Sequence, residues 1–227
     1  MSYAVKEIHY TLQGEGARTG RAAVFCRFTG CNLWSGQEQD RAKAQCRFCD
    51  TDFIGTDGHG GGTFGSAEKL AKTIAAYWPR NDAGDAVEND AGNATAKPYV
   101  VFTGGEPLLQ LDETLIKALQ VLDFEVAIET NGTLPAPPGV DWICVSPKAG
   151  TAQVQTTGHE LKVIFPQEGL DPLTLGGQAF ATRFIQPMDM LGDDAASQVN
   201  LDACIAFCRD NPAWRLSLQT HKLLGIP

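Results

Sequence analysis

The chain has 227 residues, of which 43% are hydrophobic and 20% are charged, and its formal net charge is -9. This composition is typical of a soluble globular protein, and the acidic balance argues against a nucleic acid partner, because phosphate binding needs clustered Lys and Arg. Apolar runs fall short of the ~20 residues of a membrane helix, and the first residues, MSYAVKEIHY, lack the basic and apolar regions of a signal peptide. We therefore expect a cytoplasmic protein without membrane contact, whose seven cysteines are reduced.

Apolar periodicity predicts strands and helices that alternate along the chain. The expected strands span residues 23–28, 99–102, 126–129, 142–145, 161–165, 182–185 and 215–218, and the expected helices span residues 66–77, 112–122 and 200–209. Ser66 is the expected N-cap of the first helix. Residues 79–97 are poor in large apolar side chains, which predicts a flexible surface insertion. The alternation predicts an α/β fold with a parallel sheet of the barrel or open kind, in a single domain over residues 1–227.

Polar residues or glycines directly follow six of these strands. They are Gly30 and Cys31, Thr103 to Glu106, Glu129 to Asn131, Ser146 to Lys148, Gln186 to Asp189, and Gln219 to His221. The carboxyl ends of parallel strands share one edge of the sheet, where α/β enzymes place their active sites. We therefore expect these residues to surround a common centre.

Three cysteines, Cys31, Cys46 and Cys49, are separated by fourteen and then two residues. Structural zinc is closed by four ligands, whereas an iron–sulfur cluster held by three cysteines keeps one iron open for a small molecule. We interpret the three thiols as ligands of such a cluster. Two alternatives stay open: the thiols could be unrelated buried side chains, or they could bind zinc with His59 or Cys26 as a fourth ligand. We expect His59 to be exposed and the remaining cysteines to lie in the core, namely Cys26, Cys144, Cys204 and Cys208.

The segment Thr103–Pro107, TGGEP, resembles the GGEP motif of radical S-adenosylmethionine enzymes, and the cysteine stretch, with Phe48 before its last cysteine, resembles their cluster-binding loop. Its first interval departs from the usual three residues. Further segments resemble the 7-carboxy-7-deazaguanine synthase family, some members of which have a lengthened first interval. These segments are Tyr10–Gly16, Phe28–Leu33, Cys49–Thr51, Glu129–Gly132, Ser146–Lys148 and Gln219–Lys222.

The resemblance implies a radical S-adenosylmethionine core, which is a partial TIM-like barrel with mostly parallel strands. It implies a lyase of the queuosine and 7-deazapurine pathways that converts 6-carboxy-5,6,7,8-tetrahydropterin to 7-carboxy-7-deazaguanine with loss of ammonia. The implied cofactors are a [4Fe–4S] cluster, Mg²⁺ and S-adenosylmethionine, which would yield a 5′-deoxyadenosyl radical. The implied partners are a second copy of the chain, in a homodimer, and a flavodoxin- or ferredoxin-type electron donor. Two other functions stay open: an activase that places a radical on a partner protein, and a zinc-binding module without catalysis.

The resemblance also implies roles for individual residues. Cys31, Cys46 and Cys49 would hold the cluster, and Thr51 would bind Mg²⁺. The implied cofactor-binding residues are Phe48, Cys49, Asp50, Gly104, Gly105, Glu106, Ser146, Pro147, Lys148, Gln186, Pro187, Met188 and Asp189. The implied substrate-binding residues are Leu12, Gln13, Gly14, Glu15, Gly16, Arg27, Thr103, Glu129, His221 and Pro227, the last through a terminal carboxylate. Glu129 and Arg27 are also the implied catalytic residues.

Four of these side chains have a structural alternative. Arg27 offers a planar fork for a substrate carboxylate, but it could instead pair with a structural carboxylate. Glu129 could cap a helix, and Lys148 could be a solvated surface charge. His221 could be a hydrogen-bonded histidine of the core.

Overall fold

The computed structural model describes residues 2–79 and 97–227. The expected insertion at 79–97 lies outside the described residues, apart from its two end positions. The strands are β1 (Tyr3–Leu12), β2 (Ala22–Phe28), β3 (Gly62–Phe64), β4 (Tyr99–Gly104), β5 (Glu125–Thr130), β6 (Trp142–Val145), β7 (Thr157–Phe165), β8 (Ala179–Pro187) and β9 (Arg215–Leu216). The α-helices are α1 (Ala67–Tyr77), α2 (Glu113–Gln120), α3 (Asp194–Asp210) and α4 (Thr220–Leu224).

All nine strands form one sheet in the order β3-β1-β2-β4-β5-β6-β7-β8-β9. From β2 through β4 to β9, every neighbouring pair is parallel. The prediction of a mostly parallel sheet is therefore confirmed, whereas the two antiparallel strands at one side of the sheet, β1 and the outermost strand β3, were not predicted. The sheet is open, because β3 and β9 are its outer strands.

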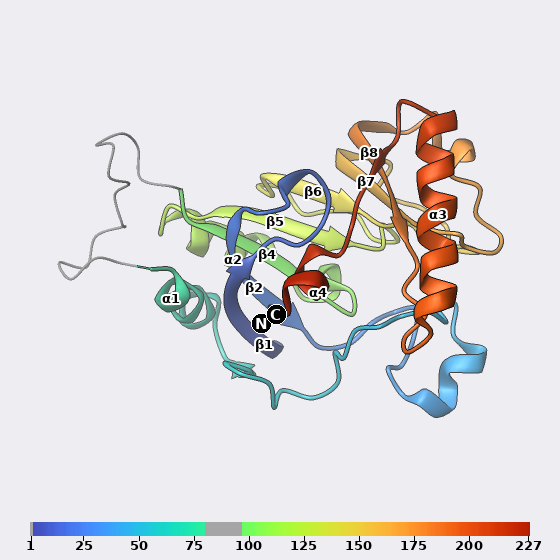
Figure 1. Ribbon diagram of the computed structural model, residues 1–227. Coiled ribbons are helices and arrows are strands. Elements are labelled where there is room, and N and C mark those ends of the chain that lie inside the picture. Colours follow the sequence, from blue (N-terminus) through green and yellow to red (C-terminus); the bar gives the residue numbers. More distant parts are fainter. Residues whose placement is uncertain (1, 80–96) are drawn as a thin grey trace.

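Hydrogen bonds from the chain after β1 to the chain after β9 show that this open sheet curves into a partial barrel. The backbone N of Gly16 donates to Ser217 Oγ at 2.9 Å, and the backbone N of Thr220 donates to the Gly14 carbonyl oxygen at 2.9 Å. Segments from opposite parts of the sheet thus meet over its concave face. The same curvature brings β1 and α4 together in Figure 1.

The helices begin at side-chain caps. Ser66 Oγ accepts from the backbone N of Lys69 at 3.3 Å, as predicted for the N-cap of α1, and Asp112 caps α2 in the same way. Helix α3 begins at Asp194 rather than at residue 200, after the cap Asp193. The crossovers over residues 131–141 and 146–156 contain no helix, so the alternation of strands and helices is less regular than predicted.

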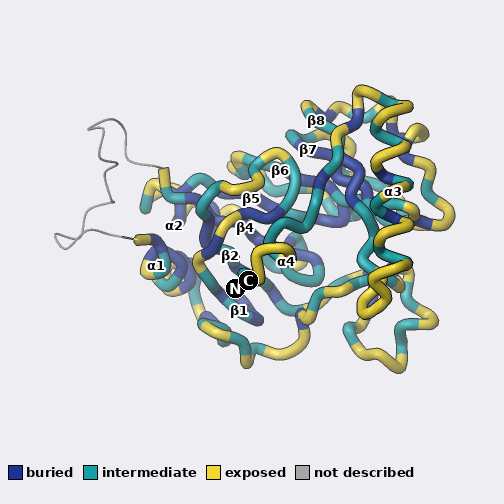
Figure 2. Tube along the Cα trace, viewed as in Figure 1, coloured by how far each residue is buried: buried dark blue, intermediate teal, exposed yellow. Residues whose placement is uncertain are grey.

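Two apolar clusters fill the space between the sheet and its helices. One packs α1 and α2 against β1, β2, β4 and β5, where Leu70 and Leu115 are fully buried. The other packs α3 against β7 and β8, around Val163 and Cys204. Burying one such leucine contributes about 1.5–3 kcal/mol. Figure 2 shows the central strands in dark blue and much of α3 in yellow, so the sheet is the core and α3 is a half-exposed cover.

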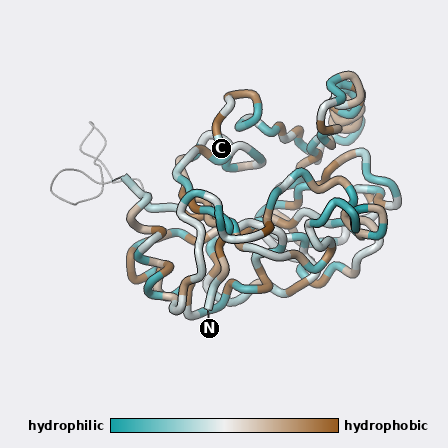
Figure 3. Tube along the Cα trace, turned by 90° about the horizontal axis from the view of Figure 1, so that it is seen from below, coloured by the Kyte–Doolittle hydropathy of each residue, from teal (hydrophilic) through white to brown (hydrophobic). Residues whose placement is uncertain are grey.

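The remaining cysteines lie as expected. Cys26, Cys144 and Cys204 are buried, and Cys208 is half-buried against the second cluster. In Figure 3, hydrophobic and hydrophilic stretches alternate along the chain. Within residues 2–79 and 97–227, no helix has the length and apolar character needed to cross a membrane.

A candidate active site at the carboxyl ends of the strands

Side chains of the central strands alternate between the outer core and the interior of the curved sheet, where they form two layers. The layer at the carboxyl ends lines a cavity of about 440 Å³ and includes Thr103, Glu129, Ser146 and Lys162. The layer beneath lines a cavity of about 10 Å³ and includes Val101, Ala127, Cys144 and Glu160, each two residues earlier in the chain. The larger cavity has a volume typical of small-molecule sites.

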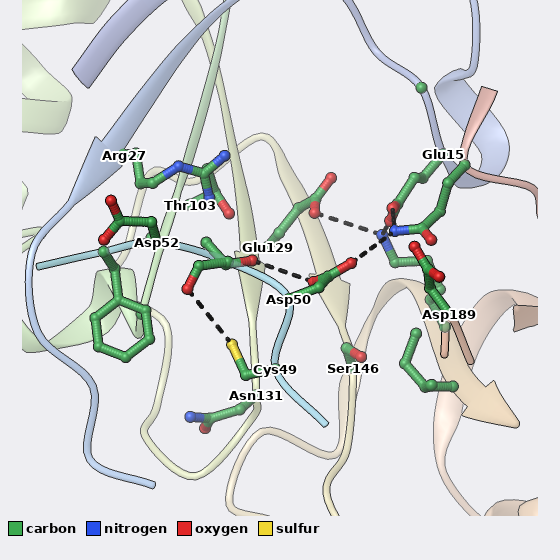
Figure 4. Close-up of a pocket in the computed structure, with 18 of the residues that line it drawn as sticks. Glu15, Arg27, Cys49, Asp50, Asp52, Thr103, Glu129, Asn131, Ser146 and Asp189 are labelled. Carbon is green, nitrogen blue, oxygen red and sulfur yellow. Dashed lines mark hydrogen bonds and ion pairs between the residues drawn. The ribbon is translucent and has the colours of Figure 1, made fainter. Parts of the chain in front are cut away.

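This larger cavity is where the sequence predicted a common centre. Every predicted site residue falls within the described ranges, and all of them line the cavity except Gly16, Glu106 and Pro147. Each of the six strand-end groups contributes at least one lining residue. Figure 4 shows Arg27 and Thr103 on one side of this space, Glu15 and Asp189 on the other, and Cys49 and Asp50 between them.

Glu106 stands behind the cavity wall. It is fully buried, and its two carboxylate oxygens accept hydrogen bonds from Thr130 Oγ1 at 2.7 Å, Asn131 N at 2.8 Å and Leu108 N at 3.0 Å. Burial raises the pKa of this carboxyl. Glu106 therefore joins the segment after β4 to the end of β5, and its predicted contact with a cofactor stays a prediction.

Gly16 and Pro147 also shape the wall without lining it. Gly16 has a φ of +65°, and a Cβ built on it would lie 1.8 Å from Glu160 Oε1. Pro147 is buried, and its carbonyl oxygen accepts from Gln167 Nε2 at 3.4 Å. These contacts give both residues a structural role, and their predicted binding roles stay predictions.

The three thiols of Cys31, Cys46 and Cys49 face the same cavity. A hydrogen bond between the thiols of Cys46 and Cys49 raises the pKa of Cys46 and lowers the pKa of Cys49. Burial raises the pKa of Cys31. The ammonium of Lys148 lies near enough to Cys46 and Cys49 to favour their thiolate forms, although burial lowers its own pKa.

The fourteen residues between the first two thiols form an ordered excursion. It contains a 3₁₀ helix, Glu38–Lys43, whose Arg41 lies over the ring of Trp34 at 4.1 Å. Arg41 Nη1 donates to the carbonyl oxygens of Arg47 at 2.9 Å and Cys49 at 3.1 Å. The long interval thus folds back onto the chain that carries the last two cysteines.

Two glycines bring the end of β4 against the first cysteine. Gly104 has a φ of +143°, and a Cβ on Gly105 would lie 2.1 Å from the Gly30 carbonyl oxygen and 2.7 Å from Cys31 Cβ. A Cβ on Gly104 would lie 2.3 Å from the Phe28 carbonyl oxygen, so a side chain at Gly104 would push β4 away from β2, and one at Gly105 would push the β4 loop away from Cys31. The site therefore has backbone groups of the β4 loop beside Cys31.

The zinc alternatives do not fit this geometry. Cys26 is fully buried in the core, and His59 is exposed, as expected, with its ring against Tyr77 and its Nδ1 3.2 Å from the Ile8 carbonyl oxygen. Neither lines the cavity. In the parts of the chain that the structure describes, no three His, Cys, Asp or Glu side chains are grouped to surround a single ion. A zinc site needs such a group, whereas in a cluster each thiolate binds a different iron.

A charged network lines the wall on the side of β5 and β7. Glu129 accepts from Gln13 Nε2 at 2.9 Å, and its other oxygen lies 3.4 Å from Lys162 Nζ. Lys162 also pairs with Glu15, which accepts from Gln219 Nε2 at 3.1 Å. Glu129 sits at the end of a strand and makes these contacts inside the cavity, so it is not a helix cap.

Structural alternatives were also stated for Arg27, Lys148 and His221, and the structure gives a different result for each of them. Arg27 does pair with a carboxylate, because its Nε donates to Glu7 Oε1 at 2.8 Å, but it also lines the cavity. Lys148 is half-buried and donates to the carbonyl oxygen and Oγ of Ser146 at 2.6 and 2.8 Å, so it is not a solvated surface charge. His221 lines the cavity over Gly14, where a Cβ would lie 2.2 Å from His221 Nδ1.

Three lysines that line the cavity were not predicted, namely Lys6, Lys162 and Lys222, and the last two join segments of the wall. Lys162 is internal to β7, where a charged side chain gives no strand-end signal. Lys222 of α4 hydrogen-bonds to Asp50 at 2.6 Å and to Asp189 at 2.5 Å, and it thereby joins the cysteine loop to the end of β8. The QTHK segment that contains Lys222 was noted in the sequence, but its lysine was given no role.

Comparison with known proteins finds relatives that share one name. No family model matches the chain. The chain is similar to 7-carboxy-7-deazaguanine synthases from Bordetella pertussis, at 56% identity, and Caulobacter vibrioides, at 54% identity, in both cases over 227 residues and 100% of each chain. A synthase of the same name from Bacteroides thetaiotaomicron is 34% identical over 226 residues, again covering 100% of each chain. The structure is similar to a crystal structure of QueE from Escherichia coli, with a TM-score of 0.64, 26% identity and coverage of 96% of this chain and 94% of that one.

Proposed function

Because the chain belongs to the 7-carboxy-7-deazaguanine synthase family, we propose that it is a lyase that converts 6-carboxy-5,6,7,8-tetrahydropterin to 7-carboxy-7-deazaguanine. Ammonia is the second product, and the pathway served is that of queuosine and related 7-deazapurines. The observation that carries the proposal is one cavity, of about 440 Å³, that unites three thiols, a glycine pair and a set of charged side chains. The chain matches the synthases from Bordetella pertussis and Caulobacter vibrioides along the whole length of both.

We propose that Cys31, Cys46 and Cys49 hold a [4Fe–4S] cluster with one open iron. The backbone of Gly104 and Gly105 would receive the methionine end of S-adenosylmethionine, since both glycines line the cavity beside Cys31. When bound, the cluster and S-adenosylmethionine would together supply one-electron chemistry, namely cleavage of the sulfonium C–S bond and removal of a hydrogen atom from the substrate. The chain's own residues bind, orient and shield the reacting groups.

Further lining residues complete the proposed cofactor side. Ser146 and Lys148 lie at the end of β6, and the ammonium of Lys148 is held by Ser146 near the thiols. Gln186 to Asp189 line the cavity at the end of β8. Thr51 is the proposed Mg²⁺ ligand, because its hydroxyl suits a hard cation that keeps several waters.

The opposite wall would hold the pterin. Its ring edge carries N–H groups, and Glu15 and Glu129 present carboxylate oxygens to the cavity. The contact with Glu7 occupies Nε of Arg27 and fixes the plane of its guanidinium, which leaves the outer nitrogens as donors for the substrate carboxylate. His221, Thr103 and Pro227 close the same part of the cavity.

Two competing functions predict different behaviour. A non-catalytic zinc module needs a fourth ligand, and neither Cys26 nor His59 reaches the cavity. An activase acts on a protein chain, whereas a cavity of about 440 Å³ suits a small molecule. A homodimer and a flavodoxin- or ferredoxin-type donor stay predictions of the family resemblance.

The direct test is anaerobic incubation of cluster-reconstituted protein with the pterin, S-adenosylmethionine and a reductant. We expect mass spectrometry to detect 7-carboxy-7-deazaguanine and ammonia to be released in equal amount. Cleavage of S-adenosylmethionine without the deazaguanine product, and with a radical signal on an added protein, would support the activase instead. Tight zinc content and no cleavage would support the binding module.

A further inference from the structure

Lys162 is a charged residue in the middle of a strand that is buried on both faces. In β7 the side chains of Leu161 and Val163 pack into the outer core, so those of Glu160, Lys162 and Ile164 point inward. Lys162 and Ile164 line the large cavity, and Glu160 lines the small one beneath it. The side chain of Lys162 is only 4% exposed. An ammonium in such a place needs a compensating anion.

Two carboxylates provide this compensation, and both line the cavity. Glu15 arrives from the loop after β1 and pairs with Lys162 Nζ, while Glu129 arrives from β5 and lies 3.4 Å from it. Each carboxylate keeps its second oxygen for an amide, because Gln219 donates to Glu15 and Gln13 donates to Glu129. One lysine thus holds two acids that come from segments far apart in the sequence.

Other charged or titratable groups face this cluster from the surrounding elements. They are Glu160 on β7, Cys144 on β6, Lys148 after β6 and His221 on α4. The backbone N of Ala17 donates to Glu160 at 3.1 Å, and burial raises the pKa of Glu160, which favours its neutral form. Glu15 and Glu129 are the carboxylates that balance Lys162, because among the described residues they are the two that form ion pairs with its Nζ.

We propose that Lys162 is a positioning residue, whose ammonium fixes Glu15 and Glu129 as two ionised acceptors on the cavity wall and thereby selects a substrate edge that presents N–H donors. The inference rests on the proposed function for the identity of that edge. It gives Lys162 a task distinct from that of the thiols, because its contacts lie on the β5 and β7 side of the cavity.

The ammonium is needed because both acids are largely shielded from solvent, with side chains that are 14% exposed for Glu15 and 23% exposed for Glu129. Burial alone would raise the pKa of Glu15, but the charge and hydrogen bond of Lys162, together with His221 and Gln219, lower the pKa overall. Without Lys162, Glu15 would lose that charge and hydrogen bond while it stays in a poorly solvated wall near a second carboxylate, so it would hold its proton to a higher pH. A protonated carboxyl offers one acceptor fewer and adds a donor, so it repels one N–H of the substrate.

The test compares Lys162→Met, Lys162→Arg and the control Lys117→Met, an exposed lysine on α2. Pterin binding is measured anaerobically by calorimetry without S-adenosylmethionine, and KM and kcat are measured in the complete reaction. For Lys162→Met we expect about tenfold to hundredfold weaker binding at about pH 6.5, which recovers towards about pH 9 as Glu15 loses its proton. KM should follow this trend while kcat changes less, and Lys162→Arg should bind without the trend.

A loss of binding in Lys162→Met that is equal at every pH would overturn the inference, as would wild-type binding. If wild-type protein fails to bind or convert the pterin, the proposed function fails instead. Circular dichroism shows whether Lys162→Met folds. If it does not fold, the inference is tested instead by infrared spectra of wild-type protein labelled with ¹³C-glutamate. The variants Glu15→Gln and Glu129→Gln identify which carboxyl band belongs to each residue. Ionised bands for both residues at neutral pH support the inference, and a protonated band for either contradicts it.

Discussion

Glu106 illustrates at the residue scale how a carboxylate can serve a binding site that it does not touch. It is fully buried behind the glycine pair, and three donors from two loops share its oxygens. The loops after β4 and β5 both line the cavity, so their separation depends on this side chain. A buried donor that loses its acceptor stays without a hydrogen bond, and this destabilises the protein by the desolvation free energy of that donor.

Glu106→Ala should therefore destabilise the protein by about 3 kcal/mol, because Thr130, Asn131 and Leu108 would each lose an acceptor. Glu106→Gln should cost less, since one amide oxygen remains to accept. Urea denaturation of the two variants measures both values. Glu168→Ala, at an exposed position, is the matched control and should stay within about 0.5 kcal/mol of wild type. Equal stability of Glu106→Ala and the control would contradict the structural role.

Helix α4 shows at the element scale how a short segment is held by polar contacts alone. The structure describes all five of its residues, and none of them is buried. Lys222 binds Asp50 and Asp189, the backbone N of Thr220 donates to Gly14, and Thr11 Oγ1 donates to a main-chain oxygen of Pro227 at 3.0 Å. The segment thus depends on the rim of the cavity for its position.

Lys222→Ala should loosen this segment without unfolding the protein. The Lys222 side chain is 38% exposed, so each of its ion pairs stabilises by about 1 kcal/mol at most. We expect faster amide exchange over residues 219–227 and a higher KM for the pterin, with the melting temperature nearly unchanged. Lys69→Ala, at an exposed position on α1, provides the control. Unchanged exchange over these residues would show that the two ion pairs do not hold α4.

The elements differ in how far the sequence could predict them. The strand Trp142–Val145 was predicted with its observed bounds, and Ser66 was predicted as a cap, because short apolar runs and caps are local signals. Strand β1 was missed because a bulge between Val5 and Glu7 interrupts its alternation. The start of α3 was missed because its first two turns are polar, and only Asn200 and Cys204 are buried along it.

The site shows the same division between local and distant signals. The strand-end residues of the cavity could be predicted, since a strand followed by polar residues is visible in the sequence. The role of Lys162 could not be predicted, because its partners Glu15 and Glu129 come from distant segments of the sequence. Glu106 was placed in the site by its motif, and only the fold shows that it supports the loops from behind.

At the scale of the whole molecule, the curved sheet has a functional end and a structural end. The carboxyl ends of the strands surround the cavity, and near their amino ends two arginines bind one carboxylate. Arg21 Nη2 donates to Glu125 Oε2 at 2.5 Å, and Arg18 pairs with the other oxygen while lying 4.0 Å over the Trp142 ring. This cluster closes the sheet beneath the small cavity.

The Glu125 cluster predicts how stability depends on pH. Burial would raise the pKa of Glu125, but hydrogen bonds from Arg21 and Arg18 outweigh it and lower the pKa. Its contribution is thus fully present above the unfolded value of about 4.3 and is lost as the pH falls through the folded value. Glu125→Gln should be about 1–3 kcal/mol less stable than wild type at neutral pH and equally stable near pH ~2. Urea denaturation measures the free energy of unfolding of both proteins across this pH range. A difference between wild type and Glu125→Gln that is the same at every pH would contradict the role of the cluster.

The proposed function depends on three thiols that hold a [4Fe–4S] cluster and leave one of its irons open towards the cavity. Mössbauer spectroscopy of protein reconstituted anaerobically with ⁵⁷Fe tests this most directly, before and after S-adenosylmethionine is added. We predict about four irons per chain, with the signal of a single iron shifted by S-adenosylmethionine and the others unchanged. Four equivalent irons that do not respond, or protein that takes up no cluster while Cys31, Cys46 and Cys49 all remain intact, would contradict it.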